Sequence, residues 1–340
     1  GEVYQVNLLE KLLVPLLSKL GNLVIDGGIW LNTQRPEWND ANNALVGQGL
    51  SMVTLYYLRR YMCYLQQLLA DESESFALSS EVSQWLTDTG FALKRVRPLL
   101  GDKPITAEQR YQSMVDLGLS SSRYRHAAYQ QEAFTAKVDQ SMDLVRALLD
   151  DALIAIDHSI KFNLREDGLY HTYNLLDMQQ GSVDVDRLYP MLEGQVAVLS
   201  AGGISPQKTV EIIEALFDSD VYRADQHSFM LYPDRKLPGF LDKNKIASEQ
   251  IGEIPLLQHM LAKKDLRIVL RDEDGCYRFN AELTNVSDLN ARLDSLSEVY
   301  GESLNAAREP LKELYENVFN HRAFTGRSGG MFGFEGLGSI

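Results

Sequence analysis

The sequence predicts an all-α fold in which helices pair as inner and outer layers. Apolar residues recur at helical spacing in most segments, as in residues 6–20, where leucines form one broad face. Strand signals are few, since only residues 266–271 and 276–279 suggest a small hairpin. Long polar connections alternate with short ones, which indicates that the long connections gather on one rim of the helical array.

The first three expected helices carry clear local signals. Gly21 is a typical residue just past the end of a helix over 6–20. Residues 49–69 are apolar nearly all round in their first half, which predicts an interior helix. Residues 81–100 are more amphipathic, and we expect an outer helix there.

The middle of the chain is expected to be helical with one interruption. Thr106 is a suitable N-cap for a helix over 106–112, which Gly118 and a run of serines then interrupt. Residues 133–162 have the pattern of one long, regular helix.

The last expected helices are shorter or broken. Ser205 and Pro206 suit the N-cap and first position of a helix over 205–217. The remaining helices are expected over residues 192–199, 246–263 and 289–320, the last broken near Pro310.

Composition excludes several classes of protein. The chain has 340 residues with 45% hydrophobic and 24% charged side chains, which is typical of a globular protein. A net charge of −14 argues against a nucleic-acid partner, and no apolar run is long enough for a membrane span. Cys63 and Cys276 form no disulfide framework, so we expect a cytoplasmic protein, with a periplasmic location left open.

We expect no metal and no cofactor. The histidines are scattered without metal-ligand spacing, and the chain contains no phosphate-binding or dinucleotide-binding glycine motif. Asp184 and Asp186 resemble the start of a cation loop, but no glycine and glutamate follow at the spacing that calcium requires.

The two ends of the sequence suggest a piece of a longer protein. Gly1 is not a natural start, and an apolar run begins just before Ile340. We therefore expect residues 1–340 to form a single catalytic domain from the C-terminal part of a larger chain, whose remainder would be its partner.

The segment 34–43 is the most informative stretch of the chain. It concentrates carboxylates, amides, a guanidinium and an indole, which are costly to bury unless they find a partner or a ligand. Acid, amide and aromatic groups together are typical of a sugar-binding site. The sequence therefore predicts that an oligosaccharide binds here.

Two segments resemble a known enzyme family. Glu37-Trp38-Asn39-Asp40 resembles the Asp-Trp-Asn-Asp-Gly segment of cellobiose-phosphorylase-like enzymes, which belong to the six-hairpin, (α/α)6-barrel glycosidase superfamily. The glycine-rich residues 327–338 resemble the late loop of those enzymes. The resemblance implies a helical-hairpin toroid, complete or incomplete, and a carbohydrate-active enzyme.

The resemblance implies that Asp40 is the general acid. That role requires a carboxyl group that keeps its proton near neutral pH. The nearby Glu37 could supply a negative charge that raises the pKa of Asp40. The alternative is that Asp40 or Asn39 caps the following helix, and capping and catalysis are compatible.

Glu335 makes the late loop differ from that of the phosphorylases. An ionised carboxylate repels phosphate but can activate water, which favours hydrolysis. The alternative is a first-turn residue favoured by the helix dipole. Glu193 is a third candidate carboxylate, as the base or as a group that binds sugar hydroxyls, and the alternative is an ordinary helix-start residue.

We therefore expect an inverting glycoside hydrolase with Asp40 as acid and Glu335, or failing that Glu193, as base. The alternatives are a glycoside phosphorylase and a non-catalytic helical scaffold that binds glycan or protein. The residues expected to bind sugar, either as ring platforms or through hydroxyl groups, are Arg35, Trp38, Asn39, Asn42, Tyr170, His171, Tyr173 and Arg327.

Overall fold

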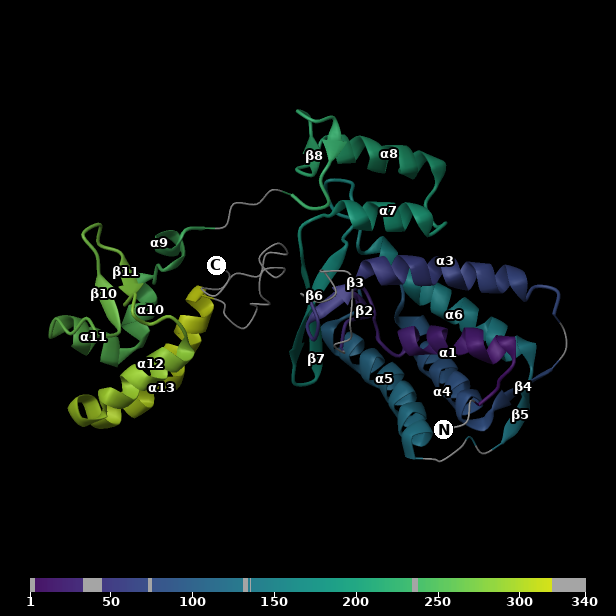
Figure 1. Ribbon diagram of the computed structural model, residues 1–340, viewed down its shortest axis with the longest axis horizontal. Helices are drawn as coiled ribbons and strands as arrows, with labels where there is room; N and C mark the ends of the chain where they lie inside the picture. Colours follow the sequence, from purple (N-terminus) through teal and green to yellow (C-terminus); the bar gives the residue numbers. More distant parts are fainter. Residues whose placement is uncertain are drawn as a thin grey trace. The chain divides into compact units, whose positions relative to one another are not determined.

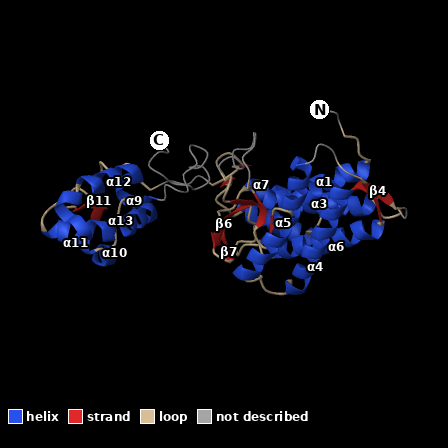
Figure 2. Cartoon of the chain, turned by 90° about the horizontal axis from the view of Figure 1, so that it is seen from below, coloured by secondary structure: helices blue, strands red, loops and turns tan. Residues whose placement is uncertain are grey.

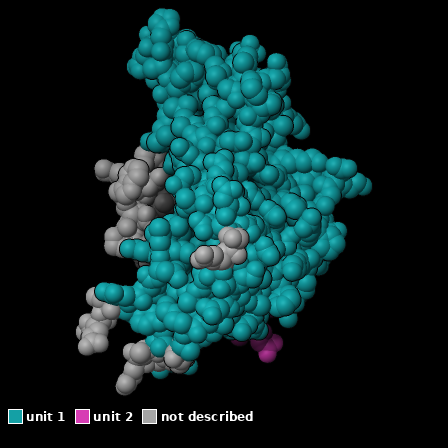
Figure 3. Space-filling model, turned by 90° about the vertical axis from the view of Figure 1, so that its right-hand side faces the viewer, with its two compact units in different colours: residues 1–234 teal, residues 235–340 magenta. Residues whose placement is uncertain are grey.

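A computed structural model describes residues 4–32, 45–72, 75–130, 134, 136–233 and 238–319. The chain divides into two compact units, residues 1–234 and residues 235–340, which Figure 3 colours separately. Each unit has its own core and is described by itself. That residues 1–340 form a single catalytic domain stays a prediction.

The first unit combines helices with antiparallel strands (Figure 1). Its described helices are α1 (Leu8–Leu20), α3 (Met52–Leu68), α4 (Ser80–Val96), α5 (Ala107–Gln130), α6 (Met142–Lys161), α7 (Leu192–Ser200) and α8 (Pro206–Phe217), with a 3-10 turn η1 (Arg97–Leu99). Helix α4 packs against α5 and α6, and α3 packs against α6 and α7.

A five-stranded antiparallel sheet in order β1-β2-β3-β6-β7 lies at one end of these helices (Figure 2). Its strands are β1 (Leu23–Val24), β2 (Gly28–Trp30), β3 (Gly49–Ser51), β6 (Tyr173–Gln179) and β7 (Ser182–Arg187). Strand β3 pairs with β6 in the register Ser51 to Tyr173, so that residues more than a hundred positions apart in the chain become neighbours.

Two smaller hairpins complete the first unit. Strand β4 (Phe76–Ser79) pairs with β5 (Lys137–Gln140) at the end of the helices away from the large sheet, and β8 (Tyr222–Arg223) pairs with β9 (Ser228–Phe229) after α8 (Figure 1).

The expectation of an all-α toroid with at most one small hairpin is wrong. The five-stranded sheet overturns it, and so do the three additional two-stranded sheets among the described residues. Strands of two or three residues are too short to show an alternating pattern. The β6–β7 hairpin turns at Gly181, whose φ of +84° suits glycine, but its polar strands look like a loop in the sequence.

The expected helices differ from the observed ones mainly in the middle of the chain. Helix α5 continues through Gly118 and the serine run, where an interruption was expected. The expected helix over 133–162 is instead strand β5 followed by α6, whose N-cap is Ser141. The expected ends of α1 at Leu20 and of α8 at Phe217 are confirmed.

The second unit has a core of its own. It contains the hairpin β10 (Val269–Arg271) and β11 (Tyr277–Phe279), and the helices α9 (Phe240–Lys243), α10 (Ser248–Glu253), α11 (Pro255–Ala262), α12 (Val286–Ser295) and α13 (Ser297–Phe319). The hairpin expected from the sequence is confirmed. Helix α13 runs through Pro310, and its non-helical residue is Gly301, with φ 48° and ψ −124°.

Aromatic packing organises that core. The Phe279 ring meets the Tyr315 ring at 5.0 Å between centroids, and Tyr315 meets Phe319 at 4.7 Å. The Tyr315 hydroxyl donates to the Leu283 carbonyl at 2.6 Å, so that the buried phenol keeps a partner.

A buried polar network centred on Asp26 joins the large sheet of the first unit to its helices. Asp26 lies in the turn between β1 and β2 with a φ of 63°, which is uncommon for a residue other than glycine. Its Oδ1 is 2.8 Å from Nδ1 of His158 on α6, and its Oδ2 accepts from the Ile105 amide at 3.0 Å. The Arg110 guanidinium of α5 is 3.6 Å from the same carboxylate.

The backbone of Asp26 is equally well bonded. Its amide donates to Ser159 Oγ at 3.0 Å, and its carbonyl accepts from Asn163 Nδ2 at 2.9 Å. Asn163 Oδ1 in turn accepts from Asn174 Nδ2 of β6 at 2.9 Å. The turn, the end of α6 and strand β6 are therefore held together by side chains that are all almost fully buried.

Arg110 adds the link to β7. Its guanidinium donates to the carbonyls of Ile25 at 2.8 Å, Ile105 at 3.1 Å and Val183 at 2.7 Å. A single buried side chain therefore links the turn, the start of α5 and the last strand of the sheet.

We predict that Arg110→Ala lowers the free energy of unfolding of the first unit by about 3–5 kcal/mol, because it leaves a buried carboxylate and three carbonyls without that partner. Urea unfolding followed by circular dichroism measures the loss. The control is Arg123→Ala on the same helix, whose ion pair with Asp88 at 3.3 Å is largely exposed and is worth less than about 1 kcal/mol. Equal losses in the two variants would contradict the role of Arg110.

Candidate functional site

Most residues predicted from the sequence to be catalytic or to bind sugar lie outside the described residues. This is the case for Arg35, Glu37, Trp38, Asn39, Asp40, Asn42, Arg327 and Glu335. Their roles stay predictions.

The structure does show where the first of those segments joins the sheet. Leu31 and Gly47, on either side of residues 33–44, are hydrogen bonded from the Gly47 amide to the Leu31 carbonyl at 2.6 Å. The Leu31 amide also donates to the Gly49 carbonyl at 2.9 Å. The described residues on either side of 33–44 are therefore held together next to the pairing of β2 with β3, and β3 itself pairs with β6.

The four described candidates come together at the start of β6 and the start of α7. The Tyr173 hydroxyl donates to Glu193 Oε2 at 3.2 Å. The Tyr170 amide donates to Gln195 Oε1 at 2.8 Å, and Gln195 Nε2 donates back to the Tyr170 carbonyl at 2.7 Å. The His171 carbonyl accepts from the Tyr56 hydroxyl at 2.9 Å.

The close approach of α7 to Thr172, the residue just before β6, depends on Gly194. A Cβ at this position would lie 2.1 Å from Thr172 Oγ1, so any larger residue would push the helix away from Thr172. The glycine thus brings the half-buried Glu193 within reach of Tyr173.

The two tyrosines proposed as sugar platforms are core residues in this part of the structure. Tyr170 and Tyr173 are 5% and 1% exposed, and the Tyr170 ring packs edge-on against Tyr56 at 6.4 Å. Their rings support the position of Glu193 and His171, and their role as platforms stays a prediction.

His171 is neutral at physiological pH. Burial lowers its pKa to about 4, and the guanidinium groups of Arg187 and Arg165 act in the same direction. The Leu188 carbonyl, 3.2 Å from Nδ1, and the Asp167 carboxylate oppose that shift. A neutral ring can donate to the Leu188 carbonyl through Nδ1 and keep the loop before α7 in place.

We predict that acid destabilises the protein partly through His171. Because the folded-state pKa lies below the unfolded value of about 6.5, the unfolded state binds the extra proton between pH 6.5 and 4, and stability falls as the pH falls through that window. His171→Asn, which retains a donor for Leu188, should reduce the slope of unfolding free energy against pH by up to about 1.4 kcal/mol per pH unit. Urea titrations at several pH values measure it, and parallel slopes would contradict the assignment.

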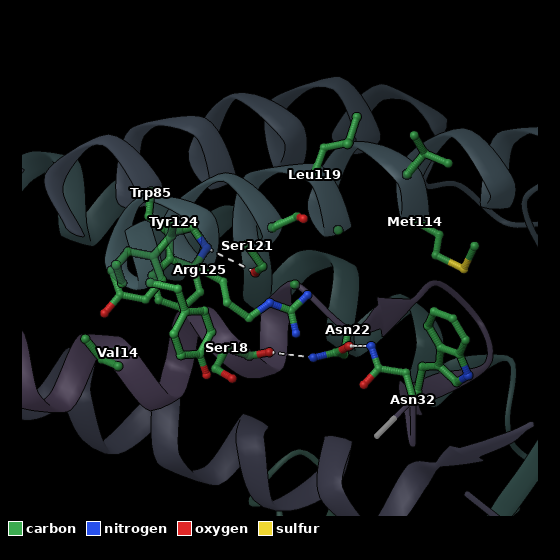
Figure 4. A pocket seen from close by; sticks show the side chains of 17 residues that line it. Val14, Ser18, Asn22, Asn32, Trp85, Met114, Leu119, Ser121, Tyr124 and Arg125 are labelled. Atoms are coloured by element: carbon green, nitrogen blue, oxygen red, sulfur yellow. Dashed lines mark hydrogen bonds between the residues drawn. The ribbon is translucent and has the colours of Figure 1, made fainter. Parts of the chain in front are cut away.

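A second candidate site was not expected from the sequence. A groove of about 690 Å³ runs between α1 and α5, with Trp85 of α4 and Trp30 of β2 in its lining (Figure 4). The α1–α5 groove is lined by Val14, Ser18, Gly21, Asn22, Trp30, Asn32, Trp85, Met114, Val115, Gly118, Leu119, Ser121, Ser122, Tyr124, Arg125, Ala128 and Tyr129.

The described residues contain no group of three or more histidine, cysteine, aspartate or glutamate side chains that could hold a metal ion. No helix in the described ranges is long and apolar enough to cross a bilayer.

Comparison with known protein families gives a match in the second unit. Residues 237–322, which fall in the second unit, match the family model of the GH149 phosphorylase insertion domain 2. No curated protein matches the chain. The match points to a carbohydrate-active enzyme, as the sequence indicated, and supports a glycoside hydrolase or phosphorylase family without supporting the (α/α)6-barrel superfamily in particular.

Proposed function

We propose that this chain is part of a glycoside phosphorylase that cleaves an oligosaccharide with inorganic phosphate. The observation that carries the proposal is the similarity of residues 237–322 to an insertion domain of phosphorylases. This similarity favours the phosphorylase alternative over the hydrolase that the sequence analysis preferred because of Glu335.

The proposed reaction is a single displacement at the anomeric carbon. A phosphate oxygen forms a bond to that carbon while the glycosidic bond to the leaving sugar breaks. Asp40 gives its proton to the leaving oxygen, so that the products are a glycosyl phosphate and a shortened sugar chain. Attack from the face opposite the leaving group inverts the configuration.

The other sequence candidates then have binding roles. Arg35, Asn39, Asn42 and Arg327 offer hydrogen-bond donors to hydroxyl or phosphate oxygens, and Trp38 offers a ring face. Glu193, supported by the Tyr173 hydroxyl at 3.2 Å, is an acceptor suited to a sugar hydroxyl.

Phosphate dependence tests the proposal. The protein is incubated with a panel of neutral oligosaccharides, with and without inorganic phosphate, and products are separated by ion chromatography. We expect glycosyl phosphate only when phosphate is present. Release of free sugar at the same rate without phosphate would return the assignment to hydrolysis, in which Glu335→Gln should abolish turnover.

We predict that Asp40→Asn lowers kcat about 10²–10⁴-fold, because the amide cannot protonate the leaving oxygen. The loss should be much smaller with a substrate whose leaving group needs no proton, such as a glycosyl fluoride. Initial rates of glycosyl phosphate formation in the phosphorolytic direction, from the oligosaccharide and from a glycosyl fluoride of the same anomeric configuration, report this difference. Asp102→Asn, at a fully exposed aspartate paired with Lys161, is the matched control and should leave both rates unchanged. An equal loss on both substrates would remove Asp40 from proton transfer.

A further inference from the structure

We propose that the α1–α5 groove binds a neutral oligosaccharide. The proposal shares only its ligand class with the proposed function, and it places that ligand on residues other than those assigned to cleavage. An open volume of about 690 Å³ falls within the range of small-molecule sites, about 300–1,000 Å³.

The depth of the groove comes from small residues where α1 and α5 meet. A Cβ at Gly21 would lie 1.8 Å from Ser121 Oγ, so only glycine allows this close approach at the end of α1. A Cβ at Gly118 would meet the Gly21 carbonyl at an ordinary 3.9 Å. Because neither glycine has a side chain, the groove stays open next to the contact between Gly21 and Ser121.

Aromatic rings occupy one end of the groove. Trp85 and Tyr124 stack at 4.2 Å with 15° between their planes, and the Trp85 indole donates to Ser121 Oγ at 3.1 Å (Figure 4). Trp85 is buried, whereas Tyr124 is partly exposed and lines the groove, so the buried indole supports a phenol that a ligand can reach. Such a rigid ring, with its negative π face, suits the polarised C–H groups on one face of a pyranose.

Two exposed side chains of α5 lie beside that stack. Arg125 and Tyr129 are four residues apart, hence on the same face of the helix, and Tyr129 is 83% exposed. The Arg125 side chain extends along the groove in the direction of Asn22 (Figure 4). Within the described ranges, Arg125 makes no hydrogen bond or ion pair, so its donors are available to hydroxyl groups.

Amides form the polar part at the other end. Asn22 Oδ1 accepts from Asn32 Nδ2 at 2.6 Å, and Asn22 Nδ2 donates to the Ser18 carbonyl at 2.8 Å. These bonds orient both amides and leave Asn32 Oδ1 and spare N–H groups for a ligand. Asn32 also directly precedes residues 33–44, which carry the proposed general acid.

The charge of the lining residues and the helical walls of the groove favour a sugar over other ligands. Among the described lining residues there is one cation and no carboxylate, which suits an uncharged, hydroxyl-rich molecule. Helices form both long walls, and their backbone groups are bonded within the helices, so an extended peptide would find few main-chain partners.

The tryptophans of the chain provide a direct test. Trp30 and Trp85 line the groove, and the third tryptophan is Trp38. In a Trp38→Phe background, tryptophan fluorescence, excited at a wavelength that tyrosine does not absorb, therefore comes only from the two residues in the groove. We expect a saturable change on titration with at least one of cellopentaose, laminaripentaose, maltopentaose or mannopentaose, without phosphate.

Substitutions then assign the change to the groove. In the same background, Arg125→Ala with Tyr129→Ala should weaken binding about tenfold or more, since a charged hydrogen bond and a ring contact are lost. Gly118→Leu, which fills the groove without touching the rings, should abolish the saturable change. Tyr64→Ala, at a 58% exposed tyrosine on α3, is the matched control and should bind as the parent does.

The outcomes separate this proposal from the proposed function. No saturable change with any of the four sugars, or equal binding by the parent, the double variant and Gly118→Leu, would overturn the groove assignment. Saturable binding that these variants weaken supports it, even if the protein makes no glycosyl phosphate. Formation of glycosyl phosphate without groove binding would leave the phosphorylase proposal standing alone.

Discussion

The arrangement of the first unit depends on burying Asp26 in a turn with positive φ. A carboxylate removed from water must find opposite charge or donors, and Asp26 finds Arg110, His158 and the Ile105 amide from three separate places in the chain. Those same groups fix the strand ends on α5 and α6. The position of β6, and with it the contact between Tyr173 and Glu193, follows from this one requirement.

Sequence patterns predicted the elements that carry their own local signals. Helices α1 and α8 have an apolar face and a capping residue, and the β10–β11 hairpin has two apolar runs around a glycine turn. The large sheet had no such signal, because its first three strands are short and its last two are polar. Helix α5 continues through Gly118, where the tertiary packing of the helix outweighs the low helix propensity of glycine.

The candidate sites differ in how visible they are in the sequence. Dense polar segments stand out in a sequence because polar groups rarely cluster without a partner. In the structure, Tyr170, His171 and Tyr173 lie near Glu193, where the start of β6 meets the start of α7. The α1–α5 groove was invisible, because α1, β2, α4 and α5 each contribute only a few residues that look like ordinary surface or core. Its signal is the pairing of Gly21 with Ser121, which only the folded chain reveals.

Strand β7 has a consequence for how copies of the protein behave in a crowded solution. In the described part of the chain it is an outer strand of the large sheet, with main-chain groups that another chain could pair with. Asp184, Asp186 and Arg187 are exposed along it, so an incoming strand would have to desolvate charges. The acidic alternation that resembled the start of a cation loop thus protects the molecule from aggregation by strand addition.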